Sequence, residues 1–150
     1  MIFTAIGAQA QSGYKTATEK VKIGGKNIVV SGNIYVNLMP MVFEESQKNI
    51  DCSKSGNLIA PATIETEDEK KLPTNLEIKK YWIKNNGIWL SMSFNKDETE
   101  TKANSIYSVA RTCPNDKFNV DIEIVAVVEL KYKGKSYFVR SSQTKLFTTH

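Results

Sequence analysis

Short runs in which apolar and polar residues alternate recur along this chain, and residues that favour turns close each run. Clear examples are residues 28–36 (IVVSGNIYV), 87–94 (GIWLSMSF) and 120–130 (VDIEIVAVVEL). Alternation with a period of two places every second side chain on the same face of a strand, whereas an amphipathic helix needs a period near 3.6. The pattern therefore predicts an all-β protein, and it points to no particular chemical activity.

The chain is long enough to fold as one domain. Its 150 residues, of which 41% are hydrophobic, can bury a core without help from a metal ion. We expect residues 13–150 to form a single β-sandwich domain, into which residues 13–18 lead. The net charge of +4 comes from basic residues interleaved with acidic ones, not from a basic stripe. We therefore predict no nucleic-acid partner.

Residues 1–12 (MIFTAIGAQAQS) resemble the end of a secretory signal peptide. A short apolar stretch leads to Ala8-Gln-Ala10, which has the small-x-small pattern of a cleavage site, although the first basic residue comes only at Lys15. We interpret residues 1–12 as a signal-peptide remnant or a disordered tail; an apolar first strand is the alternative. No later apolar run approaches the roughly 18 residues needed to cross a bilayer, so no membrane span is predicted. We expect a secreted or periplasmic protein.

The two cysteines agree with export. Cys52 and Cys113 lie in segments rich in turn-forming residues, and a pair of this kind in an exported domain is most simply a disulfide. Two free thiols are the alternative. A bridge would close a long loop, and the chain-entropy model then gives about 4 kcal/mol of stabilisation as an upper figure.

Turn residues divide the chain into eight or nine expected strands. Gly24-Gly25 and Asn86-Gly87 favour two-residue hairpin turns, because both positions of such turns need positive φ angles. Gly32 suggests a bulge or bend, and Pro61 favours an edge position because proline has no amide donor. The apolar positions change face between Ile78 and Tyr81, which indicates a β-bulge. The expected strands cover residues 20–23, 26–38, 58–66, 76–84, 88–95, 106–112, 118–132, 136–140 and 144–148.

These strands should form an antiparallel sandwich of two sheets, because no helices are expected that could connect parallel strands. A closed barrel is the alternative. In architecture alone, this strand pattern resembles immunoglobulin-like and fibronectin-like domains. Cys52 and Cys113 stand on either side of Trp82 and Trp89 in the sequence, as the cysteines of those domains bracket a core tryptophan, but here both cysteines fall in expected loops and not in mid-strand. Val125 and Val127 would need cover on the outer face. The core should contain Val120, Ile122, Ile124, Ala126, Val128 and Leu130.

The motifs of common enzymes are missing. The sequence has no nucleophile elbow, phosphate-binding loop or zinc motif, and its one histidine is His150. Acidic residues cluster at 65–69 and 97–100, where paired carboxylates could hydrolyse a glycoside or bind calcium. Both clusters lie in lysine-rich segments that are more simply solvated loops. We therefore predict no enzyme activity, no cofactor and no metal site.

Two apolar features stand out as a possible binding surface. Met39, Met41 and Phe43 belong to an apolar run where a strand becomes a loop. Tyr81 and Trp89 belong to the clearest hairpin, and Trp89 is out of phase with the apolar positions around it. Packing inside the domain is the alternative for both features.

By elimination, the sequence predicts a non-enzymatic exported binding or interaction module. Its partner would be another protein or a glycan. The alternatives are a carrier with a small ligand in a barrel cavity and, less favoured, a carboxylate-dependent hydrolase.

Overall fold

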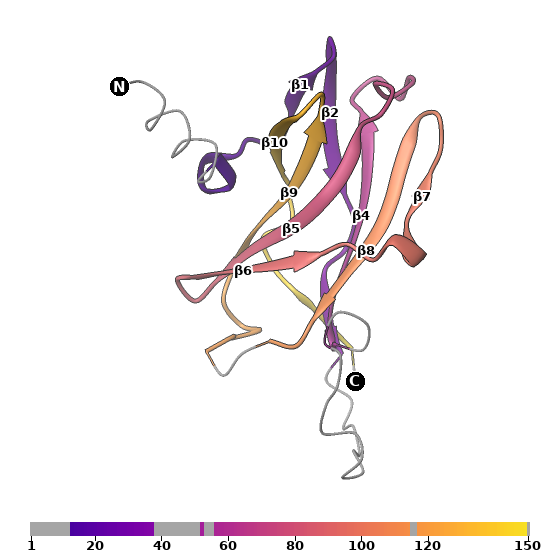
Figure 1. The fold of residues 1–150 in the computed structure, drawn as a ribbon. Coiled ribbons are helices and arrows are strands. Elements are labelled where there is room, and N and C mark those ends of the chain that lie inside the picture. The colour runs from indigo at the N-terminus through magenta and orange to yellow at the C-terminus, as the bar shows by residue number, and fades with distance from the viewer. Residues whose placement is uncertain (1–12, 38–51, 53–55, 115–116, 150) are drawn as a thin grey trace.

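The structure is a computed structural model that describes residues 13–37, 52, 56–114 and 117–149. Two β-sheets pack face to face over a common core (Figure 1), which confirms the all-β sandwich. In the part of the chain that the structure describes, the sheets do not close, so the barrel alternative is wrong. The physical reason is that the strands at the edges of one sheet do not continue into a hydrogen-bonded ladder with the edges of the other.

The smaller sheet contains the clearest hairpin. Its strand order is β10-β9-β5-β6, and all neighbours are antiparallel. The register between β5 and β9 shifts between Ile78 and Lys80, which confirms the predicted bulge. The strands are β5 (Glu77–Asn85), β6 (Ile88–Ser93), β9 (Ile124–Tyr132) and β10 (Lys135–Arg140).

The larger sheet is built around β4 (Leu58–Thr66). One side of β4 pairs with β8, which in turn pairs with β7, and the other side pairs with β2 and then β3. β7 is the outermost strand on the β8 side, and on the other side the outermost strands are β1, antiparallel to β2, and β11, parallel to β3. The remaining strands of this sheet are β1 (Val21–Ile23), β2 (Lys26–Ser31), β3 (Tyr35–Asn37), β7 (Glu100–Thr101), β8 (Ser105–Thr112) and β11 (Phe147–Thr149).

The expected position of Pro61 at a sheet edge is wrong, because β4 lies in the centre of its sheet. The sheet accepts the proline because its neighbour is interrupted there: β2 ends at Ser31, opposite Thr63, and β3 begins at Tyr35, opposite Ile59. Gly32 lies in this interruption with φ +132°, and a Cβ added to it would collide with the Pro61 carbonyl oxygen. The missing amide of proline therefore coincides with a local gap in the ladder.

The hairpin turns form as the sequence predicts. Asn86 and Gly87 have φ angles of 51° and 77°, and Gly24 and Gly25 have 55° and 79°. Positive φ at both central positions is the geometry that matches the right-handed twist of the flanking strands.

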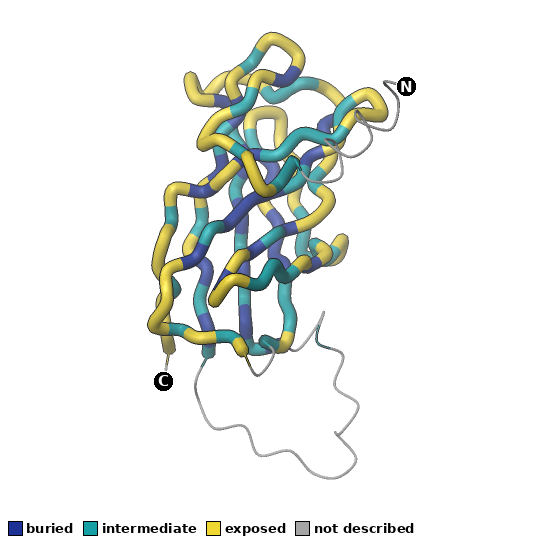
Figure 2. Tube along the Cα trace, turned by 90° about the vertical axis from the view of Figure 1, so that its left-hand side faces the viewer, coloured by how far each residue is buried: buried dark blue, intermediate teal, exposed yellow. Residues whose placement is uncertain are grey.

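The core lies between the sheets, and buried residues are spread along strands of both sheets (Figure 2). The alternation is clearest in β4, where every second residue is buried. In β9 the expected core residues Ile124, Ala126, Val128 and Leu130 are buried. The strand starts only at Ile124, however, and Ile122 is 38% exposed, so the expected start of this strand was too early. The turn that precedes β9 overrides the alternation of apolar residues there.

Cys52 and Cys113 form the predicted disulfide, which spans 61 residues of sequence. It lies beside the point where β4 begins and β8 ends, since Leu58 pairs with Thr112. A disulfide is typical of proteins in an oxidising compartment. Among the described residues, no helix is long and apolar enough to span a membrane.

Candidate functional site

A change of sheet by one strand creates the site. β6 pairs with β5 from Asn85 back to Lys80, where its partner is Ser93. The next residue, Phe94, instead forms an antiparallel bridge with Ala110 of β8, and the Asn95 amide donates to the Val109 carbonyl at 3.1 Å. β6 therefore leaves the smaller sheet before it reaches the start of β5.

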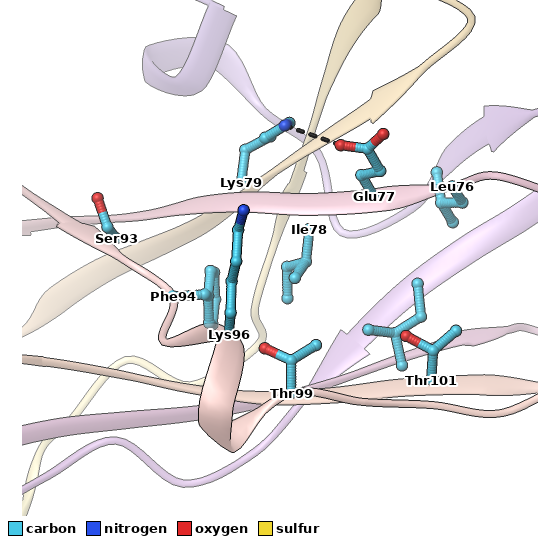
Figure 3. Close-up of a pocket in the computed structure, with 10 residues that line it drawn as sticks. Leu76, Glu77, Ile78, Lys79, Ser93, Phe94, Lys96, Thr99 and Thr101 are labelled. Atoms are coloured by element: carbon cyan, nitrogen blue, oxygen red, sulfur yellow. Dashed lines mark ion pairs between the residues drawn. The ribbon is translucent and has the colours of Figure 1, made fainter.

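Between the departing strand and β5 a cavity of about 510 Å³ opens (Figure 3). A second hollow of about 380 Å³ shares Leu76, Thr101 and Ile106 with it. We call the two hollows together the intersheet groove. It is bounded by the start of β5 on one side and by β7 and β8 on the other.

The floor of the groove is apolar. Leu76 and Ile106 are 6% and 3% exposed, and Ile78 and Phe94 are half-buried beside them. Phe94 stacks against Tyr81 with ring centroids 5.6 Å apart, which fixes its position. Half-buried apolar side chains at an open cavity lose further contact with water when a ligand covers them, and this favours binding.

The rim of the groove is rich in lysine. Lys79 pairs with Glu77 at 2.8 Å, and Lys102 pairs with Glu100 at 3.6 Å. Lys71 and Lys96 form no ion pair with any residue that the structure describes. Figure 3 shows Lys96 reaching from its short helix toward β5. The rim therefore offers unpaired positive charge above an apolar floor.

Glu77 is the one carboxylate among the described residues that line the groove. A hydrogen bond from Lys79 and the charge of that ammonium lower the pKa of the Glu77 carboxyl, and Lys131 and Lys96 add to the effect. Glu77 therefore stays ionised, whereas acid catalysis of glycoside cleavage needs a protonated carboxyl with a second carboxylate near it. Among the described residues, no three His, Cys, Asp or Glu side chains are grouped to hold a metal ion.

The short 3-10 helix η3 (Lys96–Glu98) holds the departing strand in place. The Asp97 amide donates to the Asn95 side chain at 3.0 Å, which caps the helix. Arg111 donates two hydrogen bonds to the Glu98 carboxylate, at 3.2 Å and 3.1 Å. The hydrogen bonding and charge of Arg111 lower the pKa of Glu98. These contacts fix the backbone from which Lys96 projects.

Tyr81 is fully buried, so it belongs to the core and does not line an exposed surface. Its hydroxyl is the one buried side-chain polar atom without a hydrogen-bond partner in the described part of the chain, although Ser141 lies nearby. Burial raises the pKa of this phenol. Met39, Met41 and Phe43 lie outside the described residues.

Trp89 belongs to an aromatic cluster on the outer face of the smaller sheet. The 3-10 helix η1 (Gly13–Thr16) crosses this face, and its Tyr14 ring stacks on Trp82 with centroids 4.0 Å apart and planes 2° apart. Trp89 meets the same ring edge-on at 4.9 Å. η1 lies against β9 and β10, and of the two valines expected to need cover on this face Val127 is fully buried and Val125 is half-buried. Tyr14 therefore already packs against the two tryptophans of this face.

The intersheet groove was not anticipated from the sequence, although part of its cause was visible. The bulge between Ile78 and Tyr81 indicated that the start of β5 differs from the rest of the strand. The change of sheet at Phe94 left no comparable pattern, because it depends on contacts with β8, a strand distant in sequence. In comparisons with protein-family models, curated proteins and solved structures, the chain matches none.

Proposed function

We propose that this protein is a non-enzymatic binding module that acts in an oxidising compartment outside the cytoplasm and binds a segment of another protein in its intersheet groove. The observation that carries the proposal is the groove itself: an apolar floor beneath a rim with two lysines that lack an ion-pair partner among the described residues. A ligand that combines apolar and anionic groups fits both parts of it.

A protein segment suits the groove better than a glycan. Sugars are commonly held by exposed aromatic rings, and Phe94, the aromatic residue of the floor, stacks on Tyr81 and is only half exposed. The aromatic residues on the outer face of the smaller sheet, Trp82 and Trp89, are in contact with the ring of Tyr14. The lysine rim adds a preference for carboxylates, which acidic protein segments supply.

An anionic apolar dye tests whether the groove binds ligands. We expect anilinonaphthalene sulfonate to bind to the folded protein and to bind several-fold more weakly to the Lys96→Glu variant. Lys22→Glu is the matched control, because Lys22 is an exposed lysine of β1, at the opposite edge of the larger sheet from β7. Equal dye binding by the wild type and both variants would contradict the proposed site.

Export is tested on the protein from its native host. An intact mass that begins at Gln11, with cysteines that react with an alkylating agent only after reduction, would support the proposed compartment. Two thiols that react freely without reduction would contradict it.

A further inference from the structure

We propose that the intersheet groove binds its partner by strand addition: an extended acidic segment pairs with the backbone of Glu77–Lys79 and extends the smaller sheet where β6 leaves it. This inference rests on the proposed function, which it deepens by naming the class of ligand and its mode of binding.

The first support is an unfilled side of β5. Glu77 and Ile78 pair with Lys131 and Leu130 of β9, so one side of the strand is occupied. On the other side the ladder with β6 begins only at Lys80. Among the described strands none pairs with Glu77–Lys79 on that side. Unpaired backbone groups at a sheet edge are the template to which extended segments add.

The second support is the apolar floor beside this edge. Successive side chains of an added strand would point alternately toward the groove and toward solvent. Those that point inward would meet Ile78, Phe94 and Ile106, which line the cavity. Backbone pairing thus gives the segment its direction, and the cavity gives a preference for apolar side chains at every second position.

The third support is the charge of the rim. Lys71 and Lys96 lack an ion-pair partner among the described residues, and Lys79 and Lys102 each share their charge with a neighbouring glutamate. Carboxylates on the segment would find positive charge on both sides of the groove. A basic segment would be repelled, so the charge selects between two ligands of equal hydrophobicity.

The test uses a synthetic probe, the capped octapeptide (Glu-Val)4, titrated into the full-length protein with isothermal calorimetry. We expect binding, and at least tenfold weaker binding for (Lys-Val)4. Two further peptides carry N-methyl groups, one on every Glu and the other on every Val. Because successive amides of a strand point to opposite sides, only one of the two sets faces β5. That peptide should bind about tenfold more weakly, and the other should bind like the parent.

Variants of the protein complete the test. Lys96→Glu should weaken (Glu-Val)4 binding several-fold, and Lys22→Glu should leave it unchanged. If both methylated peptides bind like the parent, or if no peptide binds while the dye still responds to Lys96→Glu, strand addition is overturned and the groove remains a ligand site. If neither probe distinguishes Lys96→Glu from wild type, the groove is not a binding site, and the proposed function falls with the inference.

Discussion

The two parts of β5 differ in their surroundings although they belong to one strand. Lys80–Asn85 lies between β9 and β6, and its inward side chains Tyr81 and Ile83 are fully buried. Among the described strands, Glu77–Lys79 pairs with β9 alone, and its side chains are exposed or half-buried. The difference arises in the adjacent strand, since β6 moves to the other sheet at Phe94. A single strand therefore contributes to the core along one part and leaves one edge without a paired strand along the other.

The largest expected effect is a difference in stability between alanine substitutions in the two parts of β5. Ile83→Ala should lower the free energy of unfolding by about 2–5 kcal/mol, because Ile83 is fully buried and leaves a cavity. Ile78→Ala removes the same atoms from a half-buried position, so it should cost about 1 kcal/mol. Urea unfolding of both variants measures the difference. Equal losses of stability would mean that Ile78 is packed as tightly as Ile83 and that the groove is not open to solvent.

A smaller effect concerns the outer face of the paired part. Tyr14→Ala should lower the free energy of unfolding by about 1–2 kcal/mol, because it removes the ring stacked on Trp82. Tryptophan emission should also shift to longer wavelength as water reaches the indole. Tyr14→Phe keeps the ring and should behave like the wild type. Unchanged emission from Tyr14→Ala would show that η1 does not cover this face in solution.

The turn that keeps β6 beside the paired part gives a third comparison. Gly87 has a φ of +77° with no atom within 4 Å of an added Cβ, so Gly87→Ala has only a backbone cost, of about 1 kcal/mol. Gly134→Ala, at φ +78° and equally free of contacts, is the matched control in the β9–β10 hairpin. The two losses, measured by thermal unfolding, should agree. A much larger loss of stability for Gly87→Ala would mean that the substitution has a cost beyond the backbone strain at residue 87.

The smallest effect concerns the ion pair that fixes the departing strand. Arg111 lowers the pKa of Glu98 in the folded protein, below the value near 4.3 of an unfolded chain. The stabilisation is therefore present at neutral pH and is lost as the pH falls through the folded pKa. Arg111→Met should be less stable than wild type at pH 7 by under about 1 kcal/mol, and the gap should narrow as the pH falls through the folded pKa of Glu98. A gap that stays constant with pH would assign the loss to packing instead.

Local rules account for most of the fold. Alternation predicted the strands other than β7, which falls in an acidic segment expected to be a loop. Paired glycine and asparagine positions predicted the turns at residues 24–25 and 86–87, and the change of face after Ile78 predicted the bulge. These features depend on residues close together in sequence, so one chain is sufficient to see them.

What the sequence did not reveal depends on distant partners. The central place of Pro61 requires the gap at Gly32, and the cover of Trp82 requires Tyr14, which lies far before it in the sequence. The groove requires Phe94, the residue after β6, to bridge to Ala110. Each depends on a contact between two segments that are apart in the sequence. The alternation of apolar and polar residues within one segment does not show which other segment it contacts.

The Cys52–Cys113 bridge also has a consequence for proteolysis. The chain between the two cysteines contains β4, β7 and β8 of the larger sheet and β5 and β6 of the smaller one, so it includes strands of both layers. Residues 67–71 and 102–104 are exposed and lie within this span, and exposed loop positions of this kind are common sites of proteolytic cleavage. A single cut there would leave two fragments joined by the cystine and by the ladders of both sheets. A nicked molecule would therefore stay in one piece even when it is unfolded, and its fragments would separate only when a reductant also breaks the cystine.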